Sequence, residues 1–98
     1  SMNILDINTI FQLLHDRKVP EEKIKSAIVK FREFNKEVSK LQNKVIAAGD
    51  ARTANIALKK AKKIERQADN LIAELIEDAK HESMSNNRKG KGNNNEHK

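Results

Sequence analysis

The side chains best able to do chemistry in this sequence are basic, and they gather in the middle of the chain. Residues 30–66 hold eleven Lys and Arg against four Asp and Glu, a net charge of +7, whereas the whole chain carries +6. Basic side chains bind phosphate groups, and the release of condensed counterions favours such binding. The sequence therefore predicts contact between this region and a polyanion. The candidate phosphate-binding residues are Lys40, Lys44, Arg52, Lys59, Lys60, Lys63 and Arg66.

The surroundings of these residues indicate what kind of nucleic acid contact is possible. The chain has no Trp or Tyr and three Phe, and none is interleaved with the lysines. Stacking on single-stranded bases is therefore not expected, and binding would be directed at the phosphate backbone. A second interpretation is that the basic residues form only the solvated face of a lysine-rich helix.

Other chemical groups in the sequence are isolated from one another. His15, His81 and His97 are far apart, and the acidic residues between positions 74 and 78 have no histidine motif beside them. No nucleophile and base stand at a spacing that would pair them. We therefore predict a protein that is not an enzyme, with no catalytic residue, metal, cofactor or small-molecule substrate.

The elements that position the basic residues are two long helices. Apolar residues recur in steps of three and four from Ile24 to Ala48 and again from Ala54 to Leu75, with Gly49-Asp50 between the two runs. This heptad spacing predicts two helices, over residues 20–48 and from about 51 to about 81, that fold back on each other as an antiparallel coiled-coil hairpin. Gly49 is expected to end the first helix in a left-handed conformation, and Asp50 to cap the second.

The hairpin register follows from side-chain size. Antiparallel layering places Phe34 opposite Ala68 and Leu41 opposite Ala61, so a large residue meets a small one in each layer. A short helix over about residues 6–17, capped by Asp6, is expected to pack at the open end of the hairpin, where the two long helices are not joined. The predicted fold is thus all-α, a partial three-helix bundle continued by a bare two-helix end.

Two apolar residues on one flank are expected to lie beyond the reach of the short helix. Ile28, Ile72 and Ile76 should be covered by it, whereas Ile46 and Leu58 should stay uncovered. Ile46 and Leu58 are therefore candidates for contact with a protein partner or with a second copy of the chain. Val29 and Ile56 are single outward-facing apolar residues, and we assign them no role.

Composition sets the remaining expectations. There is no Cys, no apolar run long enough to cross a membrane and no visible signal peptide, so we expect a cytoplasmic protein without membrane contact. Ser1 precedes Met2, and we take Met2 as the start of a complete small protein. Residues 2–82 are predicted to form one domain, and the polar Asn- and Gly-rich residues 83–98 a disordered basic tail.

Overall fold

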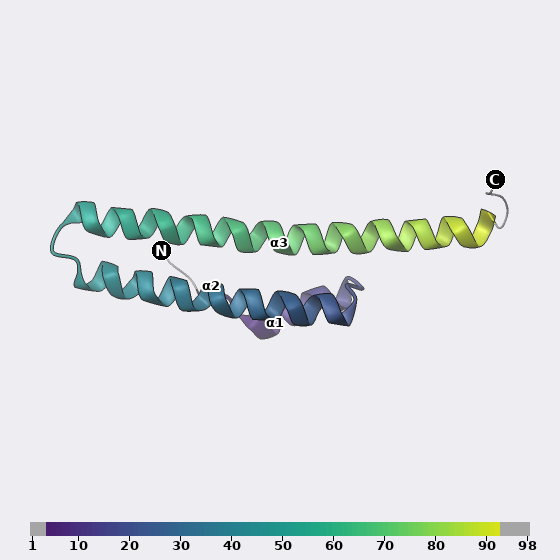
Figure 1. Ribbon diagram of the computed structural model, residues 1–98, viewed down its shortest axis with the longest axis horizontal. Coiled ribbons are helices and arrows are strands. Elements are labelled where there is room, and N and C mark those ends of the chain that lie inside the picture. Colours follow the sequence, from purple (N-terminus) through teal and green to yellow (C-terminus); the bar gives the residue numbers. More distant parts are fainter. Residues whose placement is uncertain (1–3, 93–98) are drawn as a thin grey trace.

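The computed structural model describes the backbone of residues 4–92 and the side chains of residues 4–84. It contains three helices, α1 (Ile7–Asp16), α2 (Glu21–Ala47) and α3 (Ala51–Gly92), and no strand within the described backbone. Helices α2 and α3 run side by side in opposite directions, and α1 lies against the open end of the pair (Figure 1). The predicted all-α hairpin with a short N-terminal helix is confirmed. The molecule is a rod of 67 × 23 × 16 Å.

Helix α1 begins and ends with hydrogen bonds that satisfy its terminal backbone groups. The Asp6 carboxylate accepts the Thr9 N–H at 3.3 Å and the Thr9 hydroxyl at 2.9 Å. At the other end the Lys18 N–H donates to the His15 carbonyl and the Val19 N–H to the Leu14 carbonyl, both at 3.0 Å. These two bonds make a Schellman motif, which requires a left-handed residue at Lys18, whose φ is 67°.

Helix α2 begins directly after Pro20 and ends one residue earlier than expected. Pro20 has an extended ψ of 144° and lies just outside the helix, while its carbonyl accepts the N–H groups of Lys23 and Ile24. At the C-terminus Ala48 is extended, with a ψ of 136°. The expectation of a left-handed Gly49 is wrong, because no described glycine has a positive φ. The chain leaves α2 through the extended Ala48 instead.

Helix α3 starts as predicted and continues further than predicted. The Asp50 carboxylate accepts the Thr53 N–H at 2.7 Å, as expected of a helix cap. The helix then passes its expected end near residue 81 and reaches Gly92, so residues 83–92 of the segment assigned to the tail are helical. That segment has no Pro to stop the helix. Residues 93–98 lie outside the described residues, and the division into a domain and a tail stays a prediction.

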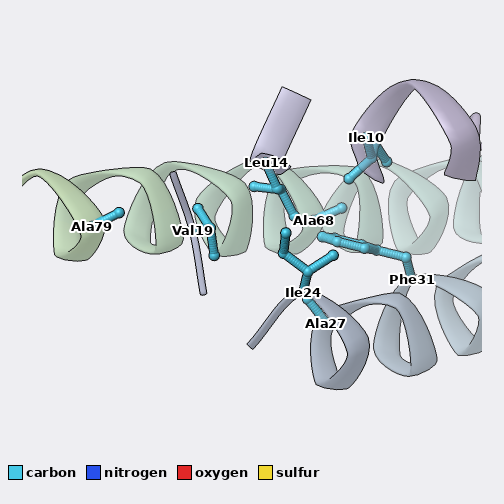
Figure 2. Close-up of a cluster of buried hydrophobic side chains, with 8 residues drawn as sticks. All are labelled: Ile10, Leu14, Val19, Ile24, Ala27, Phe31, Ala68 and Ala79. Carbon is cyan, nitrogen blue, oxygen red and sulfur yellow. The ribbon is translucent and has the colours of Figure 1, made fainter. Parts of the chain in front are cut away.

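The interior divides into two apolar clusters along the rod. The larger cluster lies at the open end, where side chains from all three helices converge on Phe31 (Figure 2). Phe31 and Leu14 are fully buried there. The smaller cluster lies nearer the turn at residues 48–50 and consists of Leu41, Ala57 and Ala61 with the half-buried Val45 and Ile64. Phe34 and Ala68 belong to the first cluster, and Leu41 and Ala61 to the second, which is consistent with the predicted layers.

Helix α1 covers one flank of the hairpin for only part of its length. Ile28, Ile72 and Ile76 pack against the larger cluster, as expected. Ile46, nearer the turn, keeps 82% of its surface exposed. We call the half of the hairpin nearest the turn the distal half. Within residues 4–92 it consists of α2 and α3 alone, with no third helix over it (Figure 1).

Candidate polyanion-binding surface

The distal half presents the predicted basic residues to solvent. All seven candidates are exposed. Two of them come from α2 and five from α3, because the hairpin returns the chain along itself. The turn thus brings residues that are about twenty positions apart in sequence onto one end of the rod.

Three of the candidates surround a single shallow depression between α2 and α3. Lys44 from α2 and Lys60 and Lys63 from α3 line this depression, which has a volume of about 310 Å³. Its lining includes Leu41 and Ile64 of the smaller apolar cluster. We call Lys44, Lys60 and Lys63 the lysine cluster.

The lining of the depression carries an excess of positive charge, three lysines against one carboxylate. Glu37 is the carboxylate in the lining of the depression. None of the seven basic candidates forms an ion pair with any side chain among residues 4–84. Three like charges around one depression repel one another, and an anion placed there would remove that repulsion.

The other four candidates do not join the cluster. Lys40, Arg52, Lys59 and Arg66 are exposed but do not line the depression. Lys59 and Arg66 stand seven residues apart, at the heptad position furthest from the seam. They add to the positive charge of the distal half from outside the depression.

The two apolar candidates differ in exposure. Ile46 is almost fully exposed, whereas Leu58 is half-buried. Neither belongs to the apolar clusters of the described residues. Both residues were predicted to stay uncovered by α1. This is confirmed for Ile46, whereas Leu58 is only partly uncovered.

The remaining polar groups form no metal-binding constellation. His15 lies 3.9 Å from the Asp16 carboxylate and His81 lies 3.3 Å from that of Glu77, with both histidines exposed. No group of three or more potential ligands occurs among the described residues. His97 lies outside them. In the same part of the chain no helix is long and apolar enough to cross a membrane.

Sequence reasoning missed two features of the described structure. The half-buried Asn35 binds the backbone of Leu5 through two hydrogen bonds, a role that the heptad pattern does not reveal. Val29, which we had assigned no role, borders a groove between α1 and α2 together with Phe11. Only Val29 left a signal in the sequence, as an apolar residue outside the heptad positions of the seam, whereas Asn35 left none.

Comparisons with known proteins do not add to this geometry. No protein-family model matches the chain, and searches of curated proteins and of solved structures find no similar protein.

Proposed function

We propose that the protein is a non-enzymatic binding module whose distal half docks on nucleic acid or a nucleoprotein through backbone phosphates. One observation carries this proposal: Lys44, Lys60 and Lys63 converge on one depression without an ion-pair partner among the described side chains. A solvated lysine face would spread its charges over the rod, and here two helices contribute charges to the same place. The absence of aromatic residues around the depression favours phosphate contact over base stacking.

Fluorescence anisotropy with a labelled duplex oligonucleotide, measured over a range of salt concentrations, tests the proposal. Three phosphate contacts predict a log–log slope of about −2.7, which is roughly a 40-fold loss of affinity between about 50 and 200 mM salt. The variant Lys44→Gln/Lys60→Gln/Lys63→Gln should lose most of the binding and of the slope.

A matched control separates the cluster from overall charge. The variant Lys25→Gln/Lys30→Gln/Lys80→Gln removes three exposed charges from outside the depression and should keep most of the affinity. Equal losses in the two variants would mean that only diffuse charge attracts the nucleic acid. No binding by the unaltered chain at the lowest salt would contradict the proposal outright.

The exposure of Ile46 supports a second candidate function, self-association or docking of a protein along the apolar flank. Burial of Ile46 and Leu58 against another helix would respond little to salt, unlike phosphate binding. Light scattering should then show a mass above that of the monomer. This mass should fall in the variants Ile46→Asp and Leu58→Asp. It should persist in Ile56→Asp, which replaces another exposed apolar residue as a control. A monomeric mass at high protein concentration would rule out self-association.

A further inference from the structure

Helix α1 and the first half of α2 enclose a groove that is distinct from the lysine cluster. It has a volume of about 390 Å³ and shares no lining residue with the distal depression. Phe11 from α1 and Val29 from α2 border it, with 40% and 60% of their surfaces exposed. Ile7 and Ile28, both half-buried against the larger cluster, lie between them. The groove is thus an apolar strip left open on an otherwise polar surface.

The charges that line the groove are all positive. Lys25 and Arg32 are its charged lining residues, and no carboxylate lines it. They stand seven residues apart on α2, so they lie on the same side of the helix and about 10 Å apart along its axis. A ligand that buries apolar side chains against Phe11 and Val29 would therefore lie close to both cations of the groove.

We propose that this groove docks an acidic amphipathic helix from another protein. A groove between two helices takes a third helix through apolar residues at i, i+3 or i+4, and i+7. A spacing of seven residues in the incoming helix would also bring two carboxylates opposite Lys25 and Arg32. A second copy of this chain is a poorer occupant, because both copies carry a net charge of +6.

Fluorescence anisotropy with labelled synthetic helices at physiological salt tests the proposal. The first peptide carries Leu along one face and Glu on both flanks, and the second carries Lys in place of every Glu. The acidic peptide should bind and the basic peptide should not. Lys25→Glu/Arg32→Glu should weaken binding of the acidic peptide roughly tenfold or more, since both attractive charge pairs become repulsive.

Control variants separate the groove from general attraction to a basic protein. Val29→Ser should weaken binding, whereas Ile56→Ser, which truncates another exposed apolar residue, should not. Lys60→Glu/Lys63→Glu reverses two charges outside the groove and should have little effect. If it weakens binding as much as Lys25→Glu/Arg32→Glu, or if the two peptides bind equally, the proposal is overturned. A concentration-dependent mass that Val29→Ser abolishes would instead identify a second copy as the occupant.

Discussion

Leu5 and Asn35 are joined by a reciprocal pair of hydrogen bonds across thirty residues of sequence. The Leu5 N–H donates to Asn35 Oδ1 at 2.7 Å, and Asn35 Nδ2 donates to the Leu5 carbonyl at 3.0 Å. One side-chain amide thus satisfies both backbone groups of Leu5, as a neighbouring strand would. This contact fixes the segment that leads into α1 against α2.

Replacement of Asn35 by Ala should loosen that segment. Two part-buried hydrogen bonds are lost and the backbone groups of Leu5 are left without them, so we expect a cost of about 1–3 kcal/mol in the free energy of unfolding. Urea denaturation followed by circular dichroism measures the change. Faster hydrogen exchange at the Leu5 amide, with little change at the Thr53 amide, would locate the effect. Unchanged exchange at Leu5 would show that Asn35 does not hold it.

Lys18→Gly should stabilise the protein. The left-handed conformation at Lys18 strains any residue that carries a Cβ, and glycine adopts it without that strain. We expect a gain of roughly 1 kcal/mol, measurable as a higher midpoint of thermal unfolding. Lys18→Ala removes the same charge but keeps the Cβ, and it should not reproduce the gain. An equal gain in both variants would attribute the effect to charge.

Gly49→Ala should also stabilise the protein, for the opposite reason. The φ angle of Gly49 is not positive, and a Cβ built there meets no atom within 4 Å. Alanine would reduce the freedom of the unfolded chain and contribute about 0.4–1 kcal/mol. The same thermal measurement decides the matter. A fall in the midpoint would show that the turn needs the conformational range of glycine.

Phe31→Ala should be the most damaging single truncation of a phenylalanine in this chain. Phe31 is fully buried where the three helices meet, and it touches Phe34 edge-on with 6.2 Å between the ring centres. We expect a loss of roughly 3–5 kcal/mol on unfolding in urea. Phe34 is half-buried, so Phe34→Ala should cost less. The reverse order would contradict the placement of the larger cluster.

The two cap aspartates should make stability depend on acid pH. Hydrogen bonds from the Thr9 hydroxyl and N–H hold the pKa of Asp6 below 3.8, and those from the Thr53 N–H and hydroxyl do the same for the pKa of Asp50. A carboxyl group whose pKa is lowered by folding stabilises the folded state at pH values above its pKa in the unfolded chain. That stabilisation is lost as the pH falls through its pKa in the folded protein. Thermal midpoints should therefore fall below pH 3.8.

The double variant Asp6→Asn/Asp50→Asn serves as the control for this pH dependence. Asparagine caps helices about as well as aspartate and has no charge to lose. The fall of the thermal midpoint in acid should be shallower in this variant than in the parent. An identical slope in the two proteins would show that other carboxyl groups govern acid unfolding.

The heptad pattern predicted the hairpin because it depends on side-chain burial along a single seam. Both aspartate caps were also readable, since aspartate is a preferred capping residue and each one directly precedes a helical pattern. The C-terminal end of α3 was not readable, because residues 83–92 lack the apolar periodicity from which the helix was predicted. The convergence of Lys44 with Lys60 followed from the register, whereas the groove at Phe11 and Val29 depends on the angle at which α1 crosses α2. Sequence spacing carries no information about that angle.

Because the interior divides into two clusters of different size, the two ends of the hairpin should differ in local stability. The smaller cluster rests on one leucine and two alanines with a half-buried valine and isoleucine, so the distal arms should separate at a lower energy than the open end. A polyanion that touches Lys44 and Lys60 together would clamp one arm to the other. Polyanion binding and the pairing of the distal arms would then be thermodynamically linked. Stronger protection of distal amides from hydrogen exchange would therefore report that the polyanion is bound.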